Sequence, residues 1–213
     1  DIDVWTECMA RNFVAGGLKK TDIVQQAHGL GLFTGGMGFH YGLERAGAKV
    51  IPTSSGGTDR QLRLMQEWGT TVFTGTPSYA AYIAEVAREK GIDPVKDLKL
   101  RLGFHGGEPV SDELRKRIDD RIGYKAHGGG MRTCYGLTEM GGPIGMDCEE
   151  IAGIHLWNDH YLVEVLDPET LVEVEPGKPG ELVITNLSFE AMPILRYRTG
   201  DRVIVSFDKC ACG

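Results

Sequence analysis

The sequence alternates short runs of β-branched and apolar residues with longer amphipathic segments, and this alternation constrains the fold most strongly. β-Branched runs favour strands, whereas apolar residues three or four positions apart favour helices. We expect helices over 3–15, 59–68 and 76–90 and from Ser111 onward. We expect strands over 23–27, 49–52, 70–74 and 100–104. Strands and helices that alternate at this spacing predict an α/β fold, a parallel-rich sheet with flanking helices.

After about residue 150 the helical period disappears. Alternating apolar residues, separated by turns rich in Pro and Gly, predict strands over 161–166, 181–187 and 202–207. We therefore divide the chain into an α/β portion over 1–152 and a smaller β-rich subdomain over 153–213. The glycine-rich run 28–38 would be a poor isolated helix, so a helix there has to pack closely on a neighbour.

The composition argues against several classes of protein. A net charge of −7 argues against a nucleic-acid partner, which requires a clustered basic face. No apolar run approaches the roughly 20 residues of a membrane span. Five cysteines, an odd number, fit a reducing compartment, and we expect a cytoplasmic protein. A start at Asp1 and a stop at Gly213 suggest a piece of a longer protein.

The segment Tyr135-Gly136-Leu137-Thr138-Glu139 combines side chains that suit a nucleotide and a metal ion. The Thr138 hydroxyl can donate to a phosphate oxygen, and the Tyr135 ring can stack on adenine. The Glu139 carboxylate can hold Mg²⁺, a hard cation that favours oxygen ligands. The alternative is a strand followed by a capping threonine and a surface glutamate.

Two further segments can contact the same ligand. In the run 196–201, Asp201 follows a glycine and can accept hydrogen bonds from ribose hydroxyls, although the run also reads as a β-turn. In Gly106-Gly107-Glu108-Pro109, the two glycines let the backbone approach a flat ring, although a tight strand-to-helix turn explains them equally well.

In this order, the three segments resemble the nucleotide-handling motifs of the adenylate-forming superfamily. The runs 31–36, 76–79, 157–160 and 167–170 resemble the phenylacetate–CoA ligase-like family, and the resemblance covers the whole chain. It implies that Thr138 contacts the α-phosphate, Glu139 holds Mg²⁺ and Asp201 holds the ribose. It implies an adenine site formed by Gly106, Gly107, Glu108, Pro109, Tyr135 and Gly136. It implies an acyl pocket lined by His28, Phe33, Pro77 and Ser78.

The resemblance implies ATP-dependent activation of an aryl or other organic acid, followed by thioester formation with CoA. The small-molecule partners would be a carboxylate and CoA. The sequence leaves open whether the protein forms a homodimer. The family's phosphate loop and its catalytic lysine lie outside this chain, so we expect residues 1–213 alone to have little ligase activity. The alternatives are an enzyme that stops at the adenylate or transfers AMP to a cofactor, and a non-catalytic, zinc-stabilised nucleotide-binding module.

Three segments depart from the family pattern. His28-Gly29-Leu30 replaces a tyrosine-bearing segment, which puts phenylacetate itself in doubt as the substrate. The backbone amides of the run 53–58 could bind an anion, but the position of the run favours the N-terminal cap of a helix. The run 127–132, which leads to Tyr135, is longer than the family pattern, and we expect a mobile loop there.

The cysteines and histidines suggest one metal site. Cys148, His155, Cys210 and Cys212 form a Cys₃His set, a common tetrahedral arrangement for zinc. Such a site would be structural and would tie the boundary segment to the chain end; the alternative is free thiols beside an unrelated histidine. Cys8 and Cys134 are expected in the core. His40, His105 and His160 are interpreted as structural, and His105 is the one to test because it adjoins the Gly106 turn.

Overall fold

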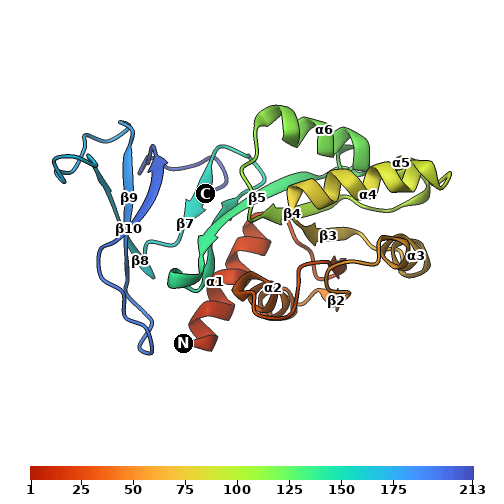
Figure 1. Ribbon diagram of the computed structural model, residues 1–213, viewed down its shortest axis with the longest axis horizontal. Coiled ribbons are helices and arrows are strands. Elements are labelled where there is room, and N and C mark those ends of the chain that lie inside the picture. Colours follow the sequence, from red (N-terminus) through yellow and green to blue (C-terminus); the bar gives the residue numbers. More distant parts are fainter. The chain divides into compact units, whose positions relative to one another are not determined.

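The computed structural model describes residues 1–213, which group into two compact units. The larger unit is Trp5–His155, and the smaller is Leu156–Gly213 together with Asp1–Val4. The expected parallel-rich sheet with flanking helices is confirmed, as is a separate small antiparallel sheet (Figure 1). No helix is both long enough and apolar enough to cross a membrane.

The large sheet has the strand order β2-β1-β3-β4-β5-β6-β7. Strands β1 to β5 run parallel to their neighbours, whereas β6 is antiparallel to β5. The strands are β1 (Ile23–Gln26), β2 (Lys49–Ile51), β3 (Val72–Gly75), β4 (Leu102–Gly106), β5 (Gly130–Leu137), β6 (Gly142–Asp147) and β7 (Ile154–Leu156). Strands β3 and β4 are buried throughout, as expected for the centre of a sheet covered on both faces.

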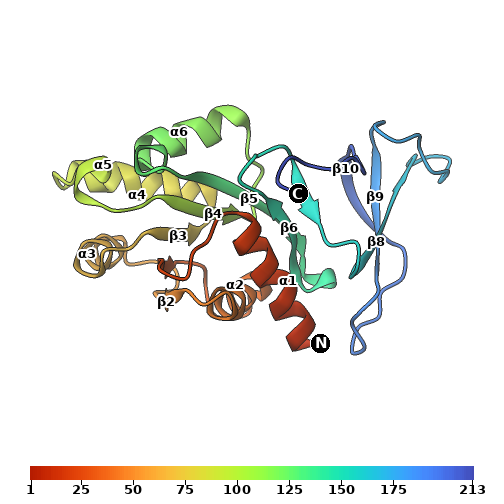
Figure 2. The same ribbon diagram turned by 180° about the vertical axis from the view of Figure 1, so that it is seen from behind.

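Helices cover both faces of this sheet and form two cores. On one face, α1 (Ile2–Ala15) and α2 (Thr34–Arg45) pack with Val24, Val72 and Phe104 (Figure 2). On the other face, α4 (Pro77–Glu89) and α6 (Asp112–Ile122) pack with Phe73, Leu100 and Met131. The remaining helices are α3 (Thr58–Trp68), the short α5 (Pro94–Asp97), and the 3₁₀ turns η1 (Lys125–His127) and η2 (Thr138–Met140).

Helix α2 is the glycine-rich helix that the sequence predicted only if it packs closely on a neighbour. A Cβ atom on Gly38 would lie 2.7 Å from the Trp5 ring, and one on Gly42 would overlap Met9. Both neighbours belong to α1, so the glycines bring the two helices together. This contact compensates for the low helix propensity of the segment, and the prediction of close packing is confirmed.

Several expected boundaries are wrong. Strand β4 runs over Leu102–Gly106 instead of 100–104. Only part of the run 127–132 is a loop, because η1 ends at His127 and β5 begins at Gly130, where it pairs in parallel with β4. A buried carboxylate anchors this strand, since the backbone N–H of Met131 donates to Asp119 Oδ1 at 2.7 Å. The run 53–58 does precede a helix, and the cap residue of α3 is Gly57, without a side-chain cap.

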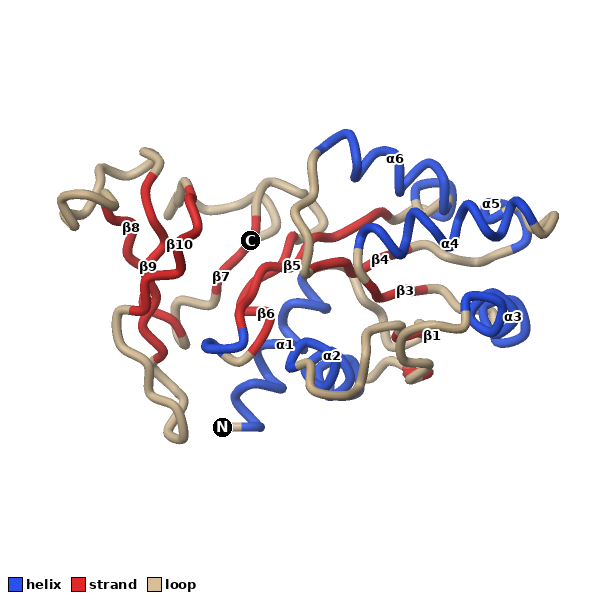
Figure 3. The backbone as a smooth tube through the Cα atoms, in the orientation of Figure 1, coloured by secondary structure: helices blue, strands red, loops and turns tan.

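The smaller unit contains three antiparallel strands, β8 (Tyr161–Leu166), β9 (Gly180–Asn186) and β10 (Tyr197–Val203), with β9 in the middle (Figure 3). The strand expected over 202–207 is wrong by several residues. The physical reason is a charge pair across the ladder: Arg198 Nε donates to both carboxylate oxygens of Glu181 at 3.1 and 3.0 Å. This pair holds the polar segment against β9.

Candidate active site

The parallel strands of the large sheet end at one edge, and most of the predicted site residues follow these ends. His28 follows β1, the Pro77-Ser78 pair follows β3, and Gly106–Pro109 follows β4. Thr138 and Glu139 follow β5, in the 3₁₀ turn η2. Ligands of open α/β sheets bind outside the carboxyl ends of the strands. The structure therefore brings residues from four separate sequence segments to the edge where a ligand is expected.

The first turn of α4, which follows β3, and the loop after β4 are joined by hydrogen bonds. The hydroxyl of Ser78 donates to Glu108 Oε1 at 2.6 Å, and the backbone N–H of Ser78 donates to Oε2 at 2.9 Å. Partial burial acts to raise the pKa of Glu108, but the hydrogen bonds from Ser78 and Thr76 outweigh it and lower the pKa. Glu108 thus stays ionised at the N-terminus of α4, where a negative charge is favourable.

The segment 135–139 begins as a strand, which the sequence offered as the alternative reading. Tyr135, Gly136 and Leu137 belong to β5, and the chain leaves the strand at Thr138. The β5–β6 ladder is irregular between Tyr135 and Gly136, and a bulge of this kind re-aims side chains. A Cβ atom on Gly136 would overlap the backbone of β6, so strand packing alone requires glycine there.

Gly106 also has a packing reason to be glycine. A Cβ atom on it would overlap Cys134 Sγ in the neighbouring strand β5. Burial raises the pKa of the Cys134 thiol to about 12, so this cysteine is an inert core residue. The core location expected for Cys8 and Cys134 is confirmed, since both are buried.

A pair of buried histidines at the same edge was not recognised as a unit from the sequence. His105 Nδ1 lies 3.0 Å from the Gly75 carbonyl oxygen, and Nε2 lies 3.0 Å from the Tyr124 hydroxyl. Burial lowers the pKa of His105 to about 4, so the ring is neutral near pH 7. Nδ1–H therefore donates to Gly75, and the Tyr124 hydroxyl donates to Nε2. The structural role expected for His105 agrees with this arrangement.

His28, one of the predicted acyl-pocket residues, is the second histidine of the pair. It is 5 % exposed, and its ring lies 4.5 Å from that of Phe39 and 6.0 Å from that of Phe33 between centroids. Burial lowers its pKa to about 4 as well, and nearby His105 acts in the same direction. Phe33, another predicted pocket residue, is half-exposed at the start of α2.

Asp201 belongs to the smaller unit and lies in β10. The β9–β10 register is irregular between Arg198 and Arg202, and Gly200 has a φ of 75°, which places a kink before Asp201. The glycine turn expected from the sequence is thus a kink inside a strand. A pocket of about 550 Å³ opens beside it, lined by Asp167, Pro168, Glu169, Pro179, Gly180, Glu181, Arg198, Gly200, Asp201 and Arg202.

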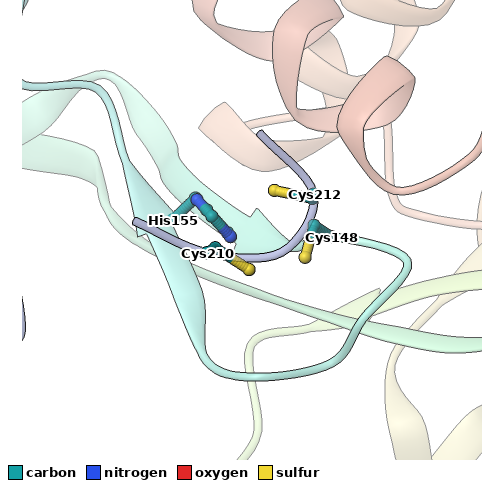
Figure 4. Close-up of side chains that lie close together, drawn as sticks. All are labelled: Cys148, His155, Cys210 and Cys212. Carbon is teal, nitrogen blue, oxygen red and sulfur yellow. The ribbon is translucent and has the colours of Figure 1, made fainter. Parts of the chain in front are cut away.

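The four predicted zinc ligands lie close together (Figure 4). One potential ligand atom from each of Cys148, His155, Cys210 and Cys212 lies within 4.8 Å of all the others. Bond lengths of about 2.3 Å to sulfur and about 2.0 Å to nitrogen place tetrahedral zinc ligands about 3.5–4 Å apart. The number, type and spacing of these side chains therefore fit a four-coordinate zinc ion.

Comparison with known proteins agrees with this architecture. The family model described as AMP-binding enzyme matches residues 6–188. The chain is 42 % identical to a phenylacetate–coenzyme A ligase of Thermus thermophilus, a match that covers 100 % of the chain and 47 % of the relative. It is 41 % identical to the Escherichia coli phenylacetate–coenzyme A ligase over 94 % of the chain and 45 % of the relative. The chain thus spans about half the length of these relatives.

A solved structure is similar over nearly the same extent. An open conformation of 2-hydroxyisobutyryl-CoA ligase, in complex with 2-HIB-AMP and CoA, superimposes with a TM-score of 0.89 at 29 % identity. The match covers 98 % of this chain and 50 % of the ligase. From the family match, the sequence relatives and the shared fold, we conclude that this chain belongs to the AMP-binding enzyme family.

Proposed function

We propose that this chain is part of an acid–thiol ligase that activates an organic carboxylate with ATP and passes the acyl group to CoA. The observation that carries the proposal is the 42 % identity to a phenylacetate–coenzyme A ligase along the whole chain. It is supported by the clustering of the predicted nucleotide and acyl residues at the carboxyl edge of the large sheet.

The reaction has two half-reactions. A carboxylate oxygen of the acid attacks the α-phosphorus of ATP, and the bond to pyrophosphate breaks, which leaves an acyl-adenylate. The sulfur of CoA then attacks the acyl carbon, loses its proton, and AMP leaves. The protein contributes alignment of the reactants and stabilisation of charge that develops on the phosphate.

We assign each predicted residue a role on this basis. Thr138 donates to the α-phosphate, and Glu139 is the carboxylate that would hold Mg²⁺, which offsets phosphate charge. Tyr135 and the turn after β4 flank adenine, and Asp201 accepts hydrogen bonds from the ribose. Acyl contacts come from His28, Phe33, Pro77 and Ser78.

We also propose that Cys148, His155, Cys210 and Cys212 bind a structural zinc ion. The support is the mutual spacing of their ligand atoms and the four-ligand set, which leaves no coordination position for a substrate. The chain has five cysteines, an odd number that fits a reducing compartment better than a disulfide scaffold, and we place the enzyme in the cytoplasm.

Pyrophosphate exchange by the full-length protein tests the adenylation step. With ATP, Mg²⁺ and a panel of aryl and short aliphatic acids, we expect acid-dependent exchange, and we expect Thr138→Ala to reduce it about 10²-fold. Absence of exchange with every acid would exclude adenylation. Addition of CoA then separates the ligase from an enzyme that stops at the adenylate, because only the ligase forms a thioester. Residues 1–213 alone are expected to show little turnover.

A further inference from the structure

The irregular stretch of β10 that contains Asp201 is a bulge. Its three residues, 199–201, lie opposite the single residue Leu182 of β9, because the regular pairing stops at Arg198 and resumes at Arg202. Bulges interrupt the ladder of backbone hydrogen bonds and re-aim side chains, and they are frequent beside active sites. The positions of these three residues, which we call the β10 bulge, therefore depend on contacts other than the regular ladder.

The hydroxyl of Thr199 holds the β10 bulge against β9. It donates a hydrogen bond to the Leu182 carbonyl oxygen at 2.9 Å, and it accepts one from the backbone N–H of Asp201 at 3.0 Å. A threonine hydroxyl has one donor and two acceptor sites, so both hydrogen bonds can form together. A single oxygen atom thus sets the position of the Asp201 backbone relative to β9.

The carboxylate of Glu181 fixes the middle of the β10 bulge. Its Oε1 atom accepts a hydrogen bond from the backbone N–H of Gly200 at 3.3 Å. Arg198 Nε donates to both oxygens of the same carboxylate, at 3.1 and 3.0 Å, which keeps the carboxylate in place. Gly200 has a φ of 75°, a backbone conformation that favours glycine, so the bend before Asp201 is built at this position.

The β10 bulge also lines the pocket of about 550 Å³ in the smaller unit. The lining includes Gly200 and Asp201 of the bulge and Pro168 of the turn after β8. Arg198 connects the two segments, because its Nη2 atom donates to the Pro168 carbonyl oxygen at 3.4 Å while its Nε atom donates to Glu181. A ligand in this pocket would meet Asp201 at a position that the contacts of the bulge have set.

We propose that Thr199 and Glu181 are positioning residues for ribose recognition, and that the β10 bulge sets the preference of the enzyme for ribonucleotides over deoxyribonucleotides. This inference rests on the role that we propose for Asp201, which accepts hydrogen bonds from the ribose hydroxyls. A hydrogen bond to an ionised carboxylate contributes about 10- to 10²-fold in affinity. It does so only at the right distance and angle, because misaligned hydrogen bonds weaken steeply.

The test compares ATP with 2′-deoxy-ATP and 3′-deoxy-ATP in pyrophosphate exchange by the full-length protein, with an acid that the wild type accepts. We expect ATP to be favoured over at least one deoxy analogue by about 10- to 10²-fold in kcat/KM. Thr199→Val removes the hydroxyl at nearly constant volume and should reduce this preference about tenfold. Thr199→Ser keeps the hydroxyl and should retain the preference. Glu181→Met, which removes the acceptor for Gly200, should reduce it as Thr199→Val does.

The ratio between two nucleotides separates positioning from a general loss of folded protein. The same folded molecules turn over both nucleotides, so a smaller folded fraction lowers both rates and leaves the ratio unchanged. A double-mutant cycle connects the effect to the carboxylate: Asp201→Ala should lose most of the preference. Adding Thr199→Val to that variant should change the ratio no further, because the hydroxyl acts through Asp201.

Each outcome decides a different point. An unchanged ratio in Thr199→Val, or an equal loss of preference in Thr199→Ser, would overturn the inference. A wild type that does not distinguish ATP from either deoxy analogue would overturn it together with the role of Asp201, while leaving the ligase function intact. Absence of exchange with every acid would remove the ligase function, and this inference with it.

Discussion

Ser78 donates two hydrogen bonds to the carboxylate of Glu108, one from its hydroxyl and one from its backbone N–H. The two residues lie 30 positions apart: Ser78 is in the first turn of α4, which we assign to the acid, and Glu108 is in the loop after β4, which we assign to adenine. Because one carboxylate connects both segments, we expect Glu108→Gln and Ser78→Ala each to raise KM for the acid and for ATP together, by several-fold.

This coupling can be checked with a double-mutant cycle on pyrophosphate exchange. The effects of the two substitutions should be less than additive in the double variant, because the hydroxyl bond that Ser78→Ala removes is one of the two bonds that Glu108→Gln disturbs. The matched control is Glu89→Gln, at an exposed position at the far end of α4, the helix that contains Ser78. This variant should leave both KM values unchanged. Strictly additive effects would show that the two loops act independently.

The two buried histidines predict a loss of stability in mild acid. Both His28 and His105 have a folded-state pKa lowered to about 4, whereas an unfolded histidine has a pKa of about 6.5. Their contribution is fully present above pH 6.5 and is lost as the pH falls from there through 4, because only the unfolded chain takes up protons in that window. Between pH 7 and pH 5 each histidine should cost about 2 kcal/mol.

Urea unfolding at the two pH values measures this loss. His28→Phe removes one of the two titrations, so the variant should lose about 2 kcal/mol less than the wild type over the same interval. An identical loss in both proteins would mean that His28 titrates normally in the folded state.

The zinc proposal predicts one equivalent of zinc per full-length chain, measured by elemental analysis of protein purified without chelators. Cys210→Ala should lose the metal and lower the melting temperature, because structural zinc contributes to folding free energy. Cys134→Ala is the control, since this buried thiol lies outside the cluster, and it should retain zinc. Metal-free protein with all four ligands intact would remove the site.

The contact between α2 and the loop after β1 predicts a large effect of one added methyl group. A Cβ atom on Gly36 would overlap the carbonyl oxygen of Gly29, and backbone on both sides cannot yield easily. We expect Gly36→Ala to cost about 1–3 kcal/mol and to raise KM for the acid, because the loop also carries His28. Gly31→Ala, where a Cβ atom meets nothing within 4 Å, should change stability by less than about 0.5 kcal/mol.

The sequence predicted the α/β architecture well because its signals there are local. Thr76 and Ser111 cap α4 and α6 through their side chains, and both helices begin where these residues predict. Strands β3 and β4 are rich in apolar residues, so their positions could be found to within about two residues, whereas the start of β5 was taken for a loop. Helix α2 was predictable only conditionally, since its existence depends on α1.

The missed features depend on distant parts of the chain. Strand β6 has the sequence GPIGMD, which has little strand propensity, and forms by pairing with β5. Strand β10 consists largely of polar residues and depends on Glu181 of β9. The bulge at Asp201 likewise depends on β9, because the Thr199 hydroxyl donates to the Leu182 carbonyl oxygen. Local pattern contains no information about such neighbours.

The glycine-lined contact between α1 and α2 fixes one end of the segment 28–33, and β1 fixes the other. Between these two anchors, exposed positions such as Leu32 can be exchanged without moving the backbone. Because we propose that this segment lines the acid site, we expect single substitutions at such exposed positions to change the substrate range while the fold is kept. The same stretch is where directed evolution of acid preference would begin.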